Sequence, residues 1–324
     1  MGGINLKICI TSVGSATALN ILKLLRKQTK YQVEIIGLDS NDFGYTSGSL
    51  LVDQFIKCPI ASEDDYIRFV DELIENENID LLIPIHDYEI HKLSQHKLNT
   101  NIIIPEQALI ELFRDKLSSA NSMQDIGIAV PPIIKVGDPL AGNYRKVIIR
   151  DRVGVGSKGI EILSKEGYLQ ISRGLDTSKK FVQEFITGDE YTVDVFSDKS
   201  GSPKLIIPRM RIEIKAGVAT KVRIVYQKEL INLTEKILKK YPIPGFCNIQ
   251  FIVNEKGIFF IELNPRYGGM SISSSIASIN VMKIFVDHFL KNELLSDMDE
   301  YMKMVRWNSV VTRYYEETIY YDEK

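Results

Sequence analysis

Four polar side chains interrupt two largely apolar, strand-forming runs near the end of the chain: Gln250, Glu262, Asn264 and Arg266. Glu262 and Asn264 are two residues apart, so a strand projects both side chains from the same face. Carboxylate and amide oxygens are ligands that a hard Mg²⁺ ion prefers, above all beside phosphate groups. The pattern therefore predicts a divalent-metal site with a guanidinium close by. The alternative is a sheet edge with solvated polar residues, which the large apolar neighbours make less favoured.

The same stretch predicts a β-hairpin, because two apolar runs flank a short polar turn that ends in Gly257. If Gly257 forms a type I turn with a bulge, Asn254 pairs with Ile258. Counting back along the two strands then places Gln250 opposite Glu262. On this register the oxygen-bearing side chains meet on one surface of the hairpin.

Composition bounds the broad class of the protein. The chain has 324 residues, enough for two or three packed units, and is 44% hydrophobic and 25% charged, as is typical of globular proteins. A net charge of −2 gives no basic surface, so nucleic acid is not an expected partner. Cys9, Cys58 and Cys247 lack metal or redox spacing and fit a reduced cytoplasm. No signal-peptide layout and no apolar run of roughly 20 residues is present, so we expect a cytoplasmic protein with no membrane partner.

The first third of the chain alternates strand and helix patterns. We expect a helix that begins at Gly14–Ser15, an acidic helix at 63–76, and strands at 6–11, 33–38, 80–84 and 102–105. This order implies a parallel, doubly wound sheet, in which ligands bind beyond the carboxyl ends of the strands. The residues expected at that edge are Gly14, Ser15, Asp39, His86 and Asp87.

The turn at Gly14 has two interpretations. It lacks the second and third glycines of a nicotinamide-binding turn, so a dinucleotide site is disfavoured. A helix N-terminus that binds a substrate carboxylate or phosphate is one reading. A plain strand-to-helix turn is the other, and the sequence leaves both open.

The middle of the chain carries two candidate cations and a glycine-rich loop. A helical pattern at 106–126 contains Lys116, and a strand at 146–150 ends in Arg150. A loop with Gly154, Gly156, Ser157 and Gly159 leads into a strand at 160–163. The backbone N–H groups of such a loop can cover phosphates as a flap, although many glycine-rich loops are simple turns.

The last 140 or so residues combine strands, including a long meander, with helices. We expect helices at 227–240 and 275–290, a closing strand within 304–321, and further strands at 181–186, 190–196, 205–208 and 209–217. Arg209 and Arg211 alternate on one strand face. They could pair with Glu262, with Glu213 or with a substrate carboxylate.

Taken in order, these features resemble the ATP-grasp enzymes, and more closely the ATP-grasp modules of the carbamoyl phosphate synthetase large subunit and related carboxylate–amine ligases. The resemblance covers essentially the whole chain, and its most specific part is Gln250 combined with residues 262–266. It implies an α/β fold: a doubly wound, Rossmann-like domain at 1–110, a small α+β lid subdomain at 111–185 and a large α+β subdomain at 186–324. ATP would lie between the antiparallel sheets of the two subdomains.

The resemblance also implies roles for individual residues. Lys116 and Arg150 would hold the triphosphate, and Arg266 would face the transferred phosphoryl group, so these three cations would supply the catalytic charge. Many relatives have lysine where Arg150 stands, and arginine can bind phosphate oxygens in the same way. The Mg²⁺ ligands would be Gln250, Glu262 and Asn264. Other nucleotide contacts would come from the flap residues Gly154, Gly156, Ser157 and Gly159, the adenine-binding linker Gln183, Glu184, Phe185 and Ile186, the ribose-binding Glu190, and Lys215.

The implied activity is an ATP-dependent ligation. ATP with Mg²⁺, as two ions or with Mn²⁺ instead, would convert a small carboxylate to an acylphosphate, and an amine would then form an amide. The expected substrates are an amino acid or a peptide, and a homodimer is a candidate assembly. The alternatives are a phosphotransfer enzyme like carbamoyl phosphate synthetase and a nucleotide-binding regulatory protein without chemistry. Candidate substrate contacts are Asp39, His86, Asp87, Arg209, Arg211, Gly268 and Gly269.

Overall fold

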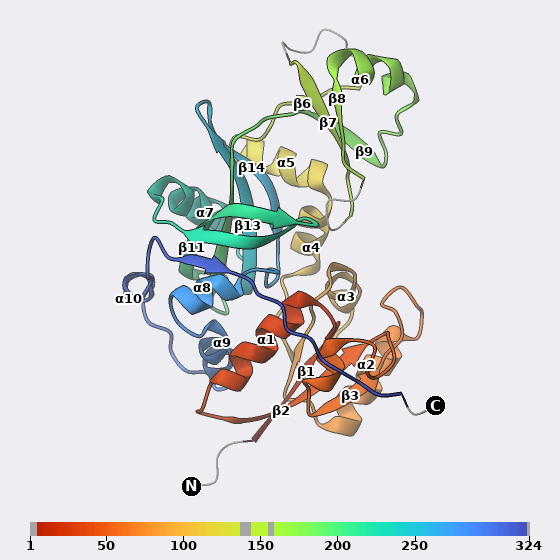
Figure 1. The fold of residues 1–324 in the computed structure, drawn as a ribbon, viewed down its shortest axis with the longest axis vertical. Coiled ribbons are helices and arrows are strands. Elements are labelled where there is room, and N and C mark those ends of the chain that lie inside the picture. The colour runs from red at the N-terminus through yellow and green to blue at the C-terminus, as the bar shows by residue number, and fades with distance from the viewer. Residues whose placement is uncertain (1–4, 137–143, 155–158, 323–324) are drawn as a thin grey trace.

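The computed structural model describes residues 5–136, 144–154 and 159–322 (Figure 1). The N-terminal sheet is parallel, with the strand order β3-β2-β1-β4-β5. Its strands are β1 (Asn5–Ile10), β2 (Gln32–Asp39), β3 (Gln54–Lys57), β4 (Leu81–Ile83) and β5 (Asn101–Ile102). The predicted parallel, doubly wound sheet is confirmed. The edge strand β3 was not predicted, because it is short and only partly buried.

Helices cover both faces of this sheet. They are α1 (Ala16–Lys27), the 3-10 helix η1 (Ser47–Leu50), α2 (Tyr66–Glu77) and α3 (Asp87–Leu93). On β1, Ile8 and Ile10 pack on the side of α1, whereas Cys9 packs with Tyr66 of α2 on the other side. Side chains that alternate along β1 therefore belong to two separate apolar clusters, one on each face of the sheet.

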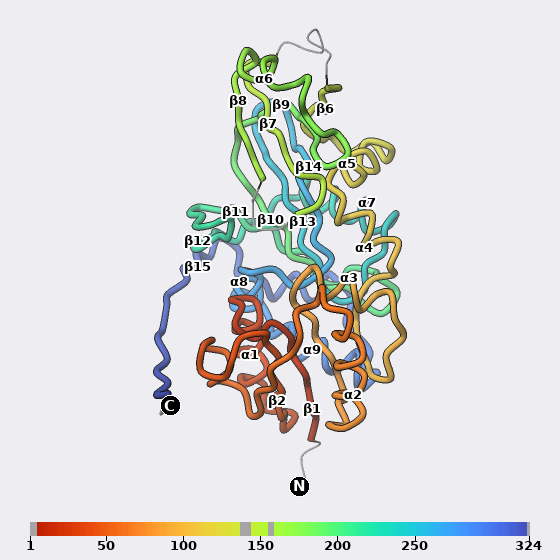
Figure 2. Tube along the Cα trace, turned by 90° about the vertical axis from the view of Figure 1, so that its right-hand side faces the viewer, coloured from red at the N-terminus to blue at the C-terminus, as the bar shows by residue number. Residues whose placement is uncertain are grey.

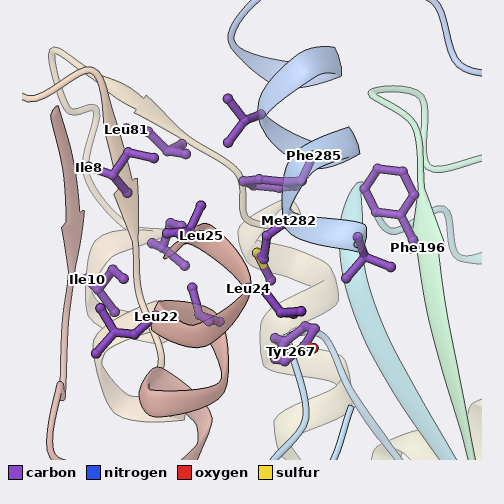
Figure 3. Close-up of a cluster of buried hydrophobic side chains, with 14 of the residues drawn as sticks. Ile8, Ile10, Leu22, Leu24, Leu25, Leu81, Phe196, Tyr267, Met282 and Phe285 are labelled. Atoms are coloured by element: carbon purple, nitrogen blue, oxygen red, sulfur yellow. The ribbon is translucent and has the colours of Figure 1, made fainter. Parts of the chain in front are cut away.

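A helix from the end of the chain completes the cluster around α1. Met282 and Phe285 of α9 (Val281–Phe289) belong to the same buried cluster as Ile8 and Leu25 (Figure 3). The single helix predicted at 275–290 is in fact two helices, α8 (Ile272–Ala277) and α9. The break arises because the Asn280 side chain accepts hydrogen bonds from the first N–H groups of α9 and so caps it.

The largest sheet is antiparallel and six-stranded, in the order β14-β13-β10-β11-β12-β15. Its strands are β10 (Asp189–Ser197), β11 (Pro203–Lys215), β12 (Val218–Ile224), β13 (Gly245–Asn254), β14 (Gly257–Asn264) and β15 (Val310–Thr312). The two strands predicted at 205–217 form one continuous strand, β11, and β12 was not predicted. The predicted closing strand is confirmed only at β15, which pairs with β12.

The apolar core of the large sheet includes residues of three helices: α4 (Gln107–Arg114), α5 (Lys116–Asp125) and α7 (Lys228–Lys240). Partly buried side chains of α10 (Met298–Lys303) pack against the same core. The single helix predicted at 106–126 breaks at Asp115, whose backbone is extended. The Asp115 carboxylate accepts hydrogen bonds from the N–H groups of Leu117 and Ser118. Lys116 is therefore the first residue of α5 and not a mid-helix residue.

A small antiparallel sheet lies at the end of the molecule farthest from the N-terminal sheet (Figure 1). Its order is β6-β9-β7-β8, with β6 (Ile133–Ile134), β7 (Lys146–Asp151), β8 (Glu161–Ser164) and β9 (Lys180–Glu184), and it carries α6 (Lys165–Ile171) and the 3-10 helix η2 (Ser172–Gly174). The glycine-rich loop joins the antiparallel strands β7 and β8, as expected. Two of its predicted flap residues, Gly156 and Ser157, lie outside the described residues.

The β13–β14 hairpin reaches from the large sheet toward the small one (Figure 2). Asn254 pairs with Gly257, so the predicted pairing with Ile258 is wrong. A bulge farther along shifts the register by one residue, and Gln250 is opposite Glu262 as predicted. The extra residue that we expected at the turn is thus inserted next to the polar cluster.

We predict that Phe285→Ala lowers the free energy of unfolding by about 3–5 kcal/mol, the usual loss for a buried phenylalanine. The side chain is 3% exposed, and its ring centroid lies 5.0 Å from that of Phe246 and 4.9 Å from that of Phe289. Chemical denaturation measures the change. Leu294→Ala is the control, because Leu294 is 97% exposed. An unchanged denaturation midpoint for Phe285→Ala would show that α9 does not complete this core.

Candidate active site

A cleft of about 640 Å³ is lined by residues of the small sheet, the large sheet and the N-terminal region. Most residues predicted to contact nucleotide or metal line it: Lys116, Arg150, Gly154, Gln183, Glu184, Phe185, Ile186, Glu190, Gln250, Glu262, Asn264 and Arg266. The predicted substrate contacts that line it are Asp87, Arg209, Arg211, Gly268 and Gly269. The fold therefore gathers residues from widely separated parts of the sequence around one cleft.

Glu262 is the hub of the polar contacts in this cleft. Its Oε1 accepts hydrogen bonds from Gln250 Nε2 at 2.8 Å and from Asn264 Nδ2 at 3.1 Å. As alternation along β14 predicted, Glu262 and Asn264 lie on the same face. The Glu262 side chain is 25% exposed, so it faces the cleft and not a dry interior.

The buried Arg150 of the small sheet and the partly buried Lys116 of α5 both lie close to Glu262. Arg150 Nη2 lies 3.6 Å from Glu262 Oε2. Burial lowers the pKa of Arg150, and the Glu262 charge opposes that effect. Burial likewise lowers the pKa of Lys116; the Glu262 charge raises it and the Arg150 charge lowers it further. Desolvated cations this close together favour an anion between them.

Lys116 is held by the segment that follows β7. Its Nζ donates to the Gly154 carbonyl at 2.7 Å, and its backbone N–H donates to the Arg152 carbonyl at 2.8 Å. Within the described residues, Lys116 forms no ion pair. Its ammonium group is thus positioned by a neutral acceptor and keeps its charge available to the cleft.

The linker 183–186 lines the cleft. The Glu184 N–H donates to the Pro132 carbonyl at 2.8 Å. A bonded antiparallel pair normally exchanges two hydrogen bonds, but proline has no N–H to return. The Glu184 carbonyl therefore lacks the donor that a ladder would supply, which leaves an acceptor at the cleft wall.

Arg211 joins two parts of the candidate site. Its Nη1 lies 2.9 Å from Glu190 Oε2 and 3.3 Å from Gln250 Oε1, and its Nη2 donates to the Gly217 carbonyl at 2.7 Å. Burial lowers the pKa of Arg211, and the Glu190 charge opposes that effect. Arg211 thus fixes Glu190 relative to Gln250 and Glu262. The sequence did not indicate that Glu190 is the partner of Arg211.

Arg266 pairs with Asp87 across the boundary between the hairpin and the N-terminal sheet. Its Nε and Nη2 donate to the two Asp87 oxygens at 2.6 and 2.9 Å. Burial opposes ionisation of Asp87, but Arg266 outweighs it and lowers the Asp87 pKa. Burial also disfavours the Arg266 charge, and Asp87 more than compensates, so the Arg266 pKa is raised. The two residues, predicted in separate roles, form one bidentate pair.

Arg209 lines the cleft, but its carboxylate partner was missed in the sequence. Its Nε and Nη2 donate to Asp194 at 2.7 and 3.2 Å, and Asp194 also accepts from the hydroxyls of Ser271 and Ser274. The pair is almost fully buried. Neither Glu262 nor Glu213, the expected partners, contacts Arg209 in the described ion pairs.

Asn248 is a second residue that the sequence analysis missed. It lines the cleft, its Nδ2 donates to the Arg266 carbonyl at 3.1 Å, and its Oδ1 accepts from Asn264 at 3.3 Å. The signal was available, because Asn248 and Gln250 are two residues apart on β13 and so share a face.

Four of the predicted site residues that the structure describes are not among those that line the cleft: Asp39, His86, Gly159 and Lys215. The buried Asp39 accepts hydrogen bonds from the Gly14 N–H at 2.9 Å and from Asn41, which supports the plain-turn reading of Gly14. His86 caps α3. The exposed Lys215 lies 3.3 Å from Glu213.

Two family models match different parts of the chain. Residues 176–312 match the family described as ATP-grasp in the biosynthetic pathway with Ter operon, and residues 8–104 match the PylC-like N-terminal domain. The biotin carboxylase domain of Hydrogenobacter thermophilus 2-oxoglutarate carboxylase has a TM-score of 0.70 at 16% identity, covering 94% of this chain and 73% of that chain. N5-carboxyaminoimidazole synthetase from Staphylococcus aureus has a TM-score of 0.70 at 15% identity, covering 91% and 80%.

Residues 176–312 of the chain belong to the ATP-grasp superfamily. The carbamoyl phosphate synthase large chain of Clostridium acetobutylicum is 23% identical to this ATP-grasp chain over 194 residues, covering 55% of the chain and 18% of that protein. The large chain of Clostridium perfringens is 23% identical over 273 residues, covering 77% and 25%. The chain thus spans at most a quarter of the length of these two relatives.

The donor set of this ATP-grasp chain fits a hard divalent ion with incomplete protein coordination. No group of three His, Cys, Asp or Glu side chains among the described residues could hold a metal. Glu262 is instead a single carboxylate beside the amides of Gln250 and Asn264. Mg²⁺ binds readily through one or two carboxylates when phosphates and water supply the other ligands.

In the part of the chain that is described, no helix is long and apolar enough to cross a membrane.

We predict a pH-dependent stability from the Asp87–Arg266 pair. The folded-state pKa of Asp87 is lowered, so its ionised form stabilises the fold above the unfolded pKa of roughly 3.9. That stabilisation is lost as the pH falls through the folded-state pKa. Asp87→Asn should therefore reduce the free energy of unfolding by about 3 kcal/mol at pH 7, and the difference from wild type should shrink below about pH 4.

Denaturation curves at several pH values measure this difference. Asp65→Asn is a matched control at the start of α2, where the exposed carboxylate makes no capping hydrogen bond. A difference between wild type and Asp87→Asn that stays constant between pH 7 and pH 3 would contradict the assignment.

Proposed function

We propose that this ATP-grasp chain is a ligase that uses ATP to activate a carboxylate as an acylphosphate for attack by an amine. One observation carries the proposal: Glu262, with two amides hydrogen-bonded to it, faces Arg150 and Lys116 inside a cleft lined by two antiparallel sheets. This arrangement suits the triphosphate of a nucleotide and a divalent ion.

The proposed reaction needs positioning and charge more than covalent help from the protein. A carboxylate oxygen of the substrate attacks the γ-phosphorus of ATP, and the bond to ADP breaks. The amine then attacks the acyl carbon, loses a proton and expels phosphate, which leaves an amide. Lys116, Arg150 and Arg266 would hold the phosphates, and Asp87 would orient Arg266.

The metal and the rest of the nucleotide are assigned in the same proposal. Mg²⁺ held by oxygens of Gln250, Glu262 and Asn264 would supply positive charge to the phosphates. The open Glu184 carbonyl in the linker 183–186 would accept from the adenine amino group, and Glu190 would bind the ribose hydroxyls.

Relatives of similar fold support the nucleotide assignment. The Hydrogenobacter thermophilus domain was solved with MgADP and bicarbonate, and the Staphylococcus aureus synthetase was also solved with ADP. At 15–16% identity these structures share the fold alone with this chain. The carboxylate, the amine and the acylphosphate are therefore proposed from the site.

A second candidate is phosphotransfer of the carbamoyl phosphate synthetase type, which the curated relatives favour. The chain spans only about a quarter of the better-covered relative, so that activity would need other parts. Release of ADP separates the candidates. ADP release that requires both a carboxylate and an amine from a library of amino acids and peptides supports the ligase. ADP release with bicarbonate and ammonia alone supports the second candidate, and tight ATP binding without turnover supports a regulatory protein.

We predict that Glu262→Gln and Asn264→Ala each lower the rate of ADP release by at least about a hundredfold, because each removes a proposed metal ligand. Circular dichroism and denaturation curves should show an intact fold. Glu255→Gln is the matched control, since it makes the same chemical change at an exposed position in the turn of the same hairpin. Wild-type turnover in either site variant would reject the metal assignment.

A further inference from the structure

Asp115 and Arg152 form an ion pair outside the lining of the cleft. Arg152 Nε donates to Asp115 Oδ2 at 3.1 Å, and Arg152 Nη2 donates to the same carboxylate. Hydrogen bonding to Asp115 raises the pKa of Arg152. Burial alone would raise the pKa of Asp115, but the hydrogen bonds and the charge of Arg152 outweigh burial, so the Asp115 pKa is lowered. The side chains are 29% and 20% exposed, so the pair is more enclosed than a typical surface bridge.

The pair connects two separately packed parts of the protein. Asp115 caps α5, whose Ala120 and Met123 lie in the apolar core of the large sheet. Arg152 follows β7 of the small sheet, and its N–H donates to the Lys179 carbonyl next to β9 at 2.7 Å. The ion pair therefore fixes the start of α5 relative to the end of β7.

Lys116 lies at this junction. It is adjacent to Asp115 in sequence, and two of its groups bind the segment that Arg152 begins: the N–H to the Arg152 carbonyl and Nζ to the Gly154 carbonyl. Arg150, which lies 3.6 Å from Glu262, is two residues before Arg152 on the same strand end. A shift between α5 and β7 would change the placement of Lys116 and Arg150 together.

We propose that Asp115 and Arg152 are positioning residues that set Lys116 against Arg150 and Glu262, and so set the affinity for the triphosphate. The inference rests on the nucleotide site of the proposed function. Neither residue needs to touch ATP, and their effect should pass through Lys116. Because a 1 Å displacement of charged groups weakens binding in a desolvated cleft, Arg152→Gln should weaken nucleotide binding by about tenfold.

The test is a pair of double-mutant cycles read by calorimetric binding of the β,γ-imido analogue of ATP with Mg²⁺. The first cycle combines Asp115→Asn with Arg152→Gln, where asparagine keeps the cap on α5. The second combines Arg152→Gln with Lys116→Met. Lys179→Gln is the control, since it removes a charge from an exposed side chain close to Arg152.

Two results are expected. The double variant Asp115→Asn/Arg152→Gln should bind no more weakly than the weaker single variant. Arg152→Gln should cause no further loss when Lys116 is already methionine. A wild-type dissociation constant for Arg152→Gln would overturn the proposal, and so would losses that multiply in the second cycle. Lower thermal stability with unchanged binding would show a structural role and would also overturn it.

The readout separates this inference from the proposed function. If the wild-type protein binds the analogue but releases no ADP with any substrate pair, the ligase proposal fails while both cycles still decide the role of the pair. If ADP release occurs and the Arg152→Gln loss is independent of Lys116, the positioning proposal fails alone.

Discussion

The charge on one carboxylate, Glu262, governs the arrangement of the cleft. It accepts from the amides of Gln250 and Asn264 and lies within 3.6 Å of Arg150. Its charge also favours the protonated forms of the partly buried Lys116 and Arg211. Without this carboxylate, the cations would repel one another in a poorly solvated space, where charges interact more strongly than in water. The site is therefore poised for a ligand that adds further negative charge.

Each cation is held by a partner from a different part of the fold. The N-terminal region supplies Asp87 for Arg266, and the large sheet supplies Glu190 for Arg211. The segment after β7 supplies a neutral carbonyl for Lys116. All three parts of the chain must consequently pack together before the cleft acquires its charge pattern. The helix α9, which returns from the end of the chain to pack on α1, ties the large sheet to the N-terminal one (Figures 1 and 3).

Local sequence patterns were sufficient to predict much of the fold and the polar cluster of Gln250, Glu262 and Asn264. Alternation along β14 predicted the shared face of Glu262 and Asn264, and the alternation of strands and helices predicted the parallel sheet. The register of Gln250 against Glu262 was right although the turn was wrong, because a bulge in the strand replaced the expected bulge at the turn. The break at Asp115 was missed because aspartate can sit on a helix surface or cap one, and only its contacts decide.

Contacts between distant residues could not be predicted in this way. Asp87 and Arg266 are 179 residues apart, and nothing in either neighbourhood indicates that they pair. The same holds for Arg209, which pairs with Asp194, and for Arg152, which pairs with Asp115. These pairs depend on how the sheets pack, which is set by apolar clusters that draw on every third of the chain. Sequence patterns therefore identified the cluster residues but not the partners that hold the cations.

The most direct test of this account is whether nucleotide binding depends on metal through Glu262. Calorimetry would measure ADP binding to the wild-type protein and to Glu262→Gln, each with Mg²⁺ and with EDTA. We predict that Mg²⁺ strengthens ADP binding to the wild-type protein by at least about tenfold and has little effect in the variant. Equal affinities with and without Mg²⁺ in the wild-type protein, or the same Mg²⁺ dependence in Glu262→Gln, would contradict the central role given to this carboxylate.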